Sequence, residues 1–407
     1  MIKSMFTFAL VSGLSVLMVL GSTGCQSERL QEEQSQEAVA PLKPALVDAT
    51  LIGAYSADQL RNRFSGSQTA LRFLIRHGIK AYRIVYNTTN TDGKTIQASG
   101  ALLVPDSAGT YSMISMQHGT IHSDYEAPSN YKPGSEAYTF GSVFSSIGYI
   151  IAAPDYIGYG ASRNLPHPYE HRESLATASF DMLRAAREFM ENNKTGWDKR
   201  LFIAGYSEGG FATMSLQKKL EEEYPGEFNL VASSAGAGAY HKTAFMKYLV
   251  NNQTHGISGF NRNYLWVMLT YNRLYSPERP VSYYAKPPYA ERIKTQQQHA
   301  GISVSLNQIF TDEFRQAINN GTDKAFLGAV ADNDVYDWKP KTPTQLYHGD
   351  ADNMVFYFNS RDAYDAMRKR GATNVELITL RGRNHGTAII HYILGTFSFF
   401  NTVGKEA

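Results

Sequence analysis

A serine flanked by glycines is the clearest candidate for chemistry in this sequence. Residues 205–209 read Gly-Tyr-Ser-Glu-Gly, with Ser207 at the centre, and the pattern Gly-x-Ser-x-Gly occurs once. An apolar run precedes these residues and a helix-like pattern follows them. A serine on a sharp strand-to-helix turn presents its Oγ for attack on a carbonyl carbon, and the crowded turn requires glycine on both sides. Ser207 is therefore the predicted nucleophile.

The nucleophile needs a base to take its proton and a carboxylate to orient that base. Where the serine lies on a strand–turn–helix unit, the chain order is serine, acid, histidine. Of the 11 histidines, only His385 and His391 follow the acidic candidates. His385 lies in a predicted loop before the last helix, whereas His391 lies one turn inside that helix. The sequence therefore predicts His385 as the base.

Two carboxylates are candidates for the acid. Asp350 and Asp352 both follow a predicted strand at residues 345–347. Open parallel sheets place their chemistry at the carboxyl ends of the strands, so both positions are suitable. Spacing alone does not separate them.

The negative oxygen that forms during acyl transfer needs two backbone N–H donors. Glu208 follows the nucleophile at a helix N-terminus, where the helix dipole also favours negative charge. The second donor is expected in the loop at residues 117–120, which reads Gln-His-Gly-Thr. Thr120 is the predicted donor, with Gly119 as the alternative.

The elements that must position these residues alternate along the chain. Apolar or alternating runs predict eight strands, the first two joined by an Asp-Gly turn and the later ones separated by helical patterns. The predicted strands are residues 81–86, 97–104, 111–116, 149–153, 201–204, 230–234, 345–347 and 375–380. This pattern favours an α/β protein with a sheet that is mixed at the start and parallel afterwards.

One long segment does not follow the alternation. Residues 236–341 lie between the sixth and seventh predicted strands, hold helical patterns in pieces, and are rich in tyrosine. We expect a helical cap inserted over the active site, which leaves residues 48–407 as one domain that includes this insertion.

Five motifs together resemble the bacterial secretory-lipase type of α/β-hydrolase, which is related to the fungal lipase A group. They lie at residues 117–120, 154–160, 205–210, 348–352 and 384–386. The resemblance implies an α/β-hydrolase fold with an eight-stranded, mostly parallel sheet. In such proteins the later aspartate of His-Gly-x-x-Asp-x-x-Val pairs with the histidine, which implies Asp352 as the acid and Asp350 as the fallback.

The predicted activity is hydrolysis of carboxylic esters by Ser207, His385 and Asp352 through an acyl-enzyme. This chemistry requires no cofactor and no metal. The expected substrates are small esters: acylglycerols, aryl esters or acylated sugars. Two alternatives are a serine peptidase on the same fold and an inert glycan-binding lipoprotein whose aromatic side chains stack on sugars.

The N-terminus has the features of an export signal. Lys3 precedes an apolar stretch, which ends in Gly-Ser-Thr-Gly before Cys25, the only cysteine. This arrangement resembles a bacterial lipoprotein processing site, with residues 1–24 as the signal peptide and Cys25 as the lipidated residue. Residues 25–47 are Gln/Glu-rich and predict a flexible tether. We therefore expect an exported protein, lipid-anchored at the bacterial envelope, at the outer membrane or cell surface.

Charge excludes one class of partner. The formal net charge is only +2, and Lys and Arg are scattered without a basic stripe. Nucleic-acid binding is therefore not expected.

Overall fold

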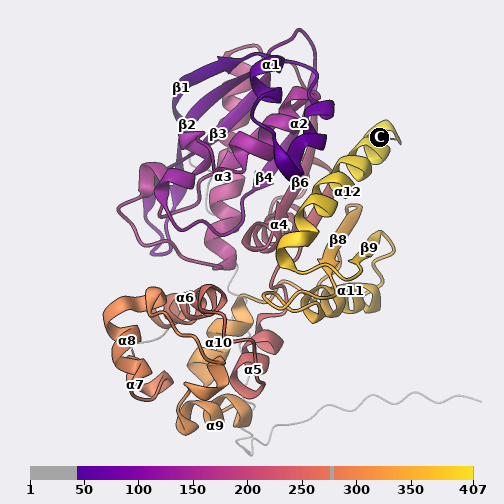
Figure 1. Cartoon of the computed structure of the whole chain (residues 1–407). Helices are drawn as coiled ribbons and strands as arrows, with labels where there is room; N and C mark the ends of the chain where they lie inside the picture. Colours follow the sequence, from indigo (N-terminus) through magenta and orange to yellow (C-terminus); the bar gives the residue numbers. More distant parts are fainter. Residues whose placement is uncertain (1–43, 276–278, 407) are drawn as a thin grey trace, which may run out of the picture. The chain divides into compact units, whose positions relative to one another are not determined.

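The computed structural model describes residues 44–275 and 279–406 (Figure 1). The predicted signal peptide, Cys25 and nearly all of the predicted tether lie outside these residues. Among the described residues, no helix is long and apolar enough to cross a membrane.

Nine strands form a single sheet in the described part of the chain, in the order β1-β2-β3-β5-β4-β6-β7-β8-β9. The strands are β1 (Leu46–Tyr55), β2 (Ile79–Thr89), β3 (Thr95–Pro105), β4 (Tyr111–Gln117), β5 (Tyr149–Pro154), β6 (Trp197–Tyr206), β7 (Asn229–Gly236), β8 (Thr344–Gly349) and β9 (Val375–Leu380). β1, β2 and β3 pair antiparallel, as do β3 and β5, and all later pairs are parallel. The predicted α/β-hydrolase fold with a mostly parallel sheet is confirmed.

The predicted strand count of eight is short by one. The missing strand, β1, lies at the edge of the sheet and pairs only with β2. Both faces of β1 are largely exposed to solvent. Its sequence therefore lacks the alternation of apolar and polar residues from which a strand is predicted. The hairpin of β2 and β3 agrees with its turn signal, because Gly93 adopts a φ of 79° and its N–H donates to the Asn90 carbonyl.

Twelve α-helices accompany this sheet in the described ranges. They are α1 (Ala57–Arg61), α2 (Ser142–Ser146), α3 (Arg172–Asn192), α4 (Glu208–Lys218), α5 (Lys242–Asn251), α6 (Ser258–Tyr275), α7 (Val281–Tyr284), α8 (Tyr289–Gln296), α9 (Asp312–Asn320), α10 (Lys324–Asp332), α11 (Phe358–Lys369) and α12 (His385–Glu406). Helix α3 packs on the sheet through an apolar face that includes Phe180, Leu183 and Met190. A second apolar cluster joins the sheet to α2 and α12 through Phe144, Tyr392 and other side chains.

Helices α5–α10 form the insertion between β7 and β8 and have an apolar core of their own (Figure 1). That core includes Phe245, Leu265, Phe314 and Phe326, all buried. Because its hydrophobic core is separate from that of the sheet, the insertion is stabilised mainly by contacts among its own helices.

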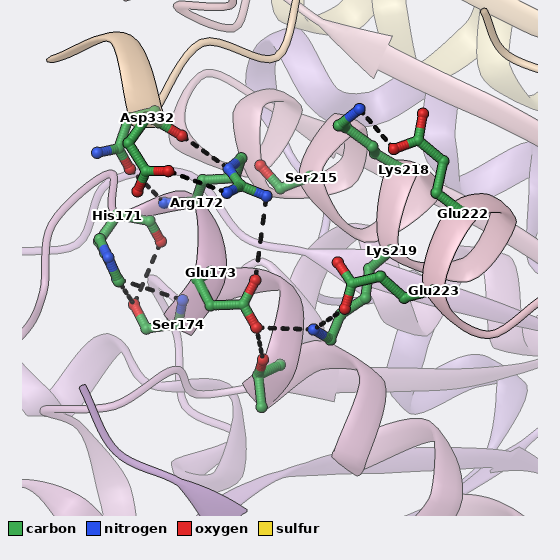
Figure 2. Close-up of polar contacts among 12 residues, drawn as sticks. His171, Arg172, Glu173, Ser174, Ser215, Lys218, Lys219, Glu222, Glu223 and Asp332 are labelled. Atoms are coloured by element: carbon green, nitrogen blue, oxygen red, sulfur yellow. Dashed lines mark hydrogen bonds and ion pairs between the residues drawn. The ribbon is translucent and has the colours of Figure 1, made fainter. Parts of the chain in front are cut away.

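Polar contacts at the start of α3 tie this insertion to the sheet helices (Figure 2). The Arg172 side chain donates to the Asp332 carbonyl at the end of α10, and its guanidinium lies 3.4 Å from the Asp332 carboxylate. The neighbouring Glu173 carboxylate accepts from Lys219 Nζ at 2.7 Å, just beyond α4. Asp332 therefore has a charged partner on α3.

Candidate active site

Ser207 lies on a strained turn between β6 and α4. Its backbone has φ 61° and ψ −122°, a conformation that residues with a Cβ rarely adopt. A Cβ added at Gly205 would lie 2.4 Å from the Gly209 carbonyl oxygen, and one at Gly209 would lie 2.1 Å from the Gln117 oxygen. Both distances are far below contact, so only glycine fits at these positions. Turns of this kind expose the serine Oγ beyond the end of the sheet.

His385 lies within hydrogen-bonding distance of the serine. Its Nε2 is 2.9 Å from Ser207 Oγ. His385 is the first residue of α12, and its carbonyl accepts a hydrogen bond of 2.8 Å from the Tyr206 hydroxyl. Tyr206 precedes the serine, so one residue of the elbow also fixes the backbone of the histidine. His391 is exposed on α12 and has no such contact with Ser207 among the described residues.

The structure brings Asp352, and not Asp350, to the histidine. Asp352 Oδ2 lies 2.6 Å from His385 Nδ1. Asp350 is exposed, and its carboxylate accepts from the Gly382 N–H at 2.6 Å. The loop after β8 therefore directs the two aspartates to different partners, which spacing could not foretell.

The Asp352 carboxylate is supported on its other side. Oδ1 accepts from the N–H groups of Met354 and Val355 at 2.9 and 3.0 Å. His348 Nε2 lies 3.3 Å from Oδ2 and 2.7 Å from the Val355 carbonyl oxygen. Burial by itself raises the pKa of Asp352, but hydrogen bonds and charge from His348 and His385 outweigh it and hold that pKa well below its usual range. The carboxylate is therefore ionised and fixed in orientation beside the imidazole.

Backbone donors near Ser207 differ in availability. The Gly119 N–H donates to the Glu136 carboxylate at 3.1 Å. Among the hydrogen bonds of the described residues, none has the N–H of Thr120 or Glu208 as its donor. The Thr120 Oγ1 lies 2.7 Å from the hydroxyl of Tyr169, which holds this loop in place. Within the described residues, the N–H groups of Thr120 and Glu208 are thus free, whereas that of Gly119 is not.

A buried pair beneath the elbow has no signal in the sequence. Glu208 Oε1 lies 2.8 Å from His167 Nε2, and both side chains are almost completely buried. The other ring nitrogen, Nδ1, lies 2.6 Å from the Ile157 carbonyl oxygen. The chain separates Glu208 from His167 by 41 positions, so only the folded structure shows that they meet.

Other histidine and aspartate side chains have structural partners. His118 is buried, with both ring nitrogens near the backbone oxygens of Gly119 and Asp155. Asp334 accepts from Thr243, and Asp337 pairs with Arg370. Within residues 44–275 and 279–406, no group of three or more His, Cys, Asp or Glu side chains could hold a metal ion.

A narrow pocket of about 40 Å³ opens beside the serine, between the sheet domain and the insertion. Its walls are mostly apolar and come largely from α5 and α6. The lining residues include Ser207, Tyr169, Glu170, Lys242, Phe245, Met246, Leu249, Asn263, Val267, Val330 and Val355. Such a pocket suits an aliphatic or aromatic group attached to a carbonyl carbon at Ser207.

The Secretory lipase family matches residues 137–393 of the chain, which include the elbow, both aspartates and His385. The chain belongs to this family. It is a carboxylic ester hydrolase of the α/β-hydrolase fold, in agreement with the resemblance of its motifs. No curated protein sequence matches it significantly.

Solved structures share the fold of this secretory lipase. A protein from Legionella pneumophila, named as a candidate hydrolase, is 25% identical with a TM-score of 0.78, over 88% of this chain and 98% of that one. The rice cell wall degrading esterase LipA from Xanthomonas oryzae is 24% identical with a TM-score of 0.71, over 89% and 98%. Lipase A from Candida antarctica, in its closed state, is 15% identical with a TM-score of 0.65, over 88% and 81%.

Proposed function

We propose that Ser207, His385 and Asp352 are the catalytic triad of this ester hydrolase. The observation that carries the proposal is the 2.9 Å contact between His385 Nε2 and Ser207 Oγ. The 2.6 Å contact between His385 Nδ1 and Asp352 supports it, because a carboxylate there keeps the proton on Nδ1 and leaves Nε2 free to accept.

The reaction proceeds in two halves. Ser207 Oγ attacks the ester carbonyl carbon as His385 Nε2 takes the serine proton, and the carbonyl oxygen becomes an oxyanion. Collapse of this intermediate breaks the bond to the alcohol oxygen, which receives the proton from His385. A water molecule then attacks the acyl-enzyme while His385 takes its proton, and the acid leaves as Ser207 regains a proton.

The Thr120 and Glu208 N–H groups are the proposed oxyanion donors. Their lack of another acceptor among the described residues supports this role, and the engagement of the Gly119 N–H by Glu136 argues against the alternative. Loss of one such donor costs on the order of 10²–10³ in kcat. The N-terminus of α4 adds a favourable dipole at the same point.

The proposed substrates are small esters: acylglycerols, aryl esters or acylated sugars. The apolar pocket supports an acyl group of this kind beside Ser207. Membership of the lipase family favours ester hydrolysis over the peptidase and glycan-binding alternatives.

The family description indicates export. We propose that residues 1–24 are a lipoprotein signal peptide, that lipid on Cys25 anchors the protein to the bacterial envelope, and that residues 25–47 are the tether. The last two tether residues, 46 and 47, already begin β1. Residues 48–407, together with the start of β1 at residues 46 and 47, are then the hydrolase domain, with the cap at about 236–341.

Replacement of the nucleophile tests the proposal. The Ser207→Ala variant should keep its far-ultraviolet circular dichroism and melting temperature but lose hydrolysis of p-nitrophenyl esters by a factor of about 10³ or more. A folded variant that keeps substantial turnover would overturn the assignment.

A further inference from the structure

Two oppositely charged side chains line the pocket beside Ser207. Glu170, before α3, and Lys242, at the start of α5, form an ion pair, with side-chain exposures of 9% and 4%. Lys242 Nζ also lies 4.1 Å from the centre of the Phe211 ring. Ion pairs in an apolar surrounding lose hydration that their mutual attraction does not always replace. A pocket for plain hydrocarbon would be better served by apolar side chains.

The pair keeps unused hydrogen-bonding capacity. An ammonium group has three donors, and among the described residues Lys242 Nζ donates only to Glu170 Oε2. No described residue donates to the second carboxylate oxygen, Oε1. Burial opposes the charged form of each partner, and it raises the pKa of Glu170 and lowers that of Lys242. Both groups therefore gain from a further hydrogen-bonding partner.

A third polar group lines the same pocket. The side chain of Asn263, on α6, is buried, and its Oδ1 has no hydrogen-bond donor within the described part of the chain. An unpaired buried acceptor is destabilising, because it has lost its hydrogen bond to water. A ligand that carries a proton donor would remove this cost.

The backbone at Glu170 is held in an unusual conformation. Its φ is 51°, in the left-handed region, and its carbonyl accepts a hydrogen bond of 2.8 Å from the Tyr271 hydroxyl. A non-glycine residue in this region is strained and persists only where its surroundings impose it. The fold thus holds the Glu170 carboxylate at the pocket against a local preference.

We propose that this pocket selects esters whose acyl chain carries a hydroxyl group. The hydroxyl oxygen would accept from Lys242 Nζ, and its proton would go to Glu170 Oε1 or Asn263 Oδ1. The apolar walls formed by Phe245, Leu249 and their neighbours would hold the methylene groups between this hydroxyl and the carbonyl carbon at Ser207. The inference rests on the proposed role of Ser207.

Other polar substituents fit less well. A substrate carboxylate would be attracted by Lys242 but repelled by Glu170, and a substrate ammonium would meet the reverse. A hydroxyl both donates and accepts, so it satisfies the two members of the pair at once. A plain alkyl chain offers no further hydrogen bond to the Lys242–Glu170 pair and none to Asn263 Oδ1.

The test compares matched pairs of ethyl esters: hexanoate, octanoate and decanoate, each with and without a terminal hydroxyl, together with butyrate and 3-hydroxybutyrate. Titration of the released acid gives kcat/KM for each ester. The wild type should prefer the hydroxylated ester by about tenfold at one chain length or more, as one additional buried hydrogen bond allows. In the Glu170→Met/Lys242→Met double variant, which removes both charges together, the alkyl ester should be preferred at every length.

The control is Lys219→Met. Lys219 is also a buried lysine paired with carboxylates, Glu173 and Glu223, but it is not among the residues that line the pocket (Figure 2). In this variant, the ratio of kcat/KM for the hydroxylated ester to kcat/KM for the alkyl ester should stay within about twofold of the wild-type ratio, since Lys219 contacts no substrate. Each ratio is measured within one preparation, so partial misfolding of a variant cancels.

Two results would overturn the inference: a wild type that prefers the alkyl ester at all lengths, or a hydroxyl preference that survives in the double variant. Failure of the proposed function would look different. In that case the hydrolysis of both kinds of ester would be absent, or would persist in Ser207→Ala.

Discussion

The hydroxyl of Tyr169 lies 2.7 Å from Oγ1 of Thr120, so a side chain after β5 holds the loop that follows β4. The Tyr169 ring also stacks on Trp266 of α6, with centroids 4.4 Å apart and planes within 9°. The proposed oxyanion donor is thus held by a residue that itself packs against the cap.

Removal of this hydroxyl should loosen the Thr120 loop. We expect Tyr169→Phe to lower kcat by about 10-fold, with little change in KM. This loss is smaller than that expected when an oxyanion donor is removed altogether, because the Thr120 N–H is still present. Thr120→Ala removes the other partner of the same bond and keeps the N–H. Steady-state kinetics on the two single variants and the double variant should show non-additive losses, because one contact is removed in each. Fully additive losses would show that the two side chains act separately.

The two aspartates after β8 should differ sharply in their effect on activity. Asp352→Asn leaves the size of the side chain unchanged but no longer stabilises the required proton position and charge on His385. We expect kcat to fall by about 10⁴-fold, as for the equivalent change in other serine triads. Asp350→Asn is the matched control. Its kcat should stay within about threefold of the wild-type value, since the Asp350 side chain is exposed. Equal losses in the two variants would contradict the assignment of the acid.

Steric crowding at the elbow should make the protein's stability sensitive to replacement of its glycines. Gly209→Ala would place a Cβ 2.1 Å from the Gln117 carbonyl oxygen, so we expect loss of the folded protein or a fall in unfolding free energy of more than about 3 kcal/mol. Gly328→Ala, inside α10 with nothing within 4 Å of the new Cβ, should instead stabilise by about 0.5–1 kcal/mol. Thermal and urea unfolding of the two variants measure this difference, and similar stabilities would contradict the crowded geometry.

His171 should make stability depend on pH. Burial lowers the pKa of His171 to about 4, below the ordinary value of 6.5. Between these values the unfolded chain binds the proton and the folded chain does not, so stability falls as pH falls from 6.5 to 4. The ring Nδ1 accepts from the Ser174 N–H at the start of α3. Asn in its place keeps a capping group but does not titrate.

Urea unfolding of wild type and His171→Asn at pH 7.5 and 4.5 tests this linkage. From pH 7.5 to pH 4.5, the free energy of unfolding should fall by about 2 kcal/mol more in the wild type than in the variant. Equal losses would show that His171 is protonated in the folded protein at pH 4.5.

Part of the site could be proposed from the sequence because a local motif marks the nucleophile. The elbow is a short strand–turn–helix unit, and chain order with loop position reduced 11 histidines to His385. The choice between Asp352 and Asp350 came from resemblance, because it depends on the path of one loop. The edge strand β1 escaped prediction, since exposure on both faces removes its pattern.

Two buried polar pairs near Ser207 could not be predicted from the sequence. Glu170 and Lys242 are 72 positions apart, and Glu208 and His167 are 41 positions apart. Each pair joins segments that only the folding of the insertion or of the loop after β5 brings together. Local sequence patterns contain no information on contacts between residues so far apart in the chain.

We propose that Ser207 forms the acyl-enzyme. Mass spectrometry of the intact protein after treatment with a fluorophosphonate, followed by peptide mapping, tests it most directly. We expect a single adduct on Ser207, with loss of p-nitrophenyl ester hydrolysis in proportion to labelling, and no adduct on folded Ser207→Ala. An adduct on another residue, or full activity in a completely labelled protein, would contradict it.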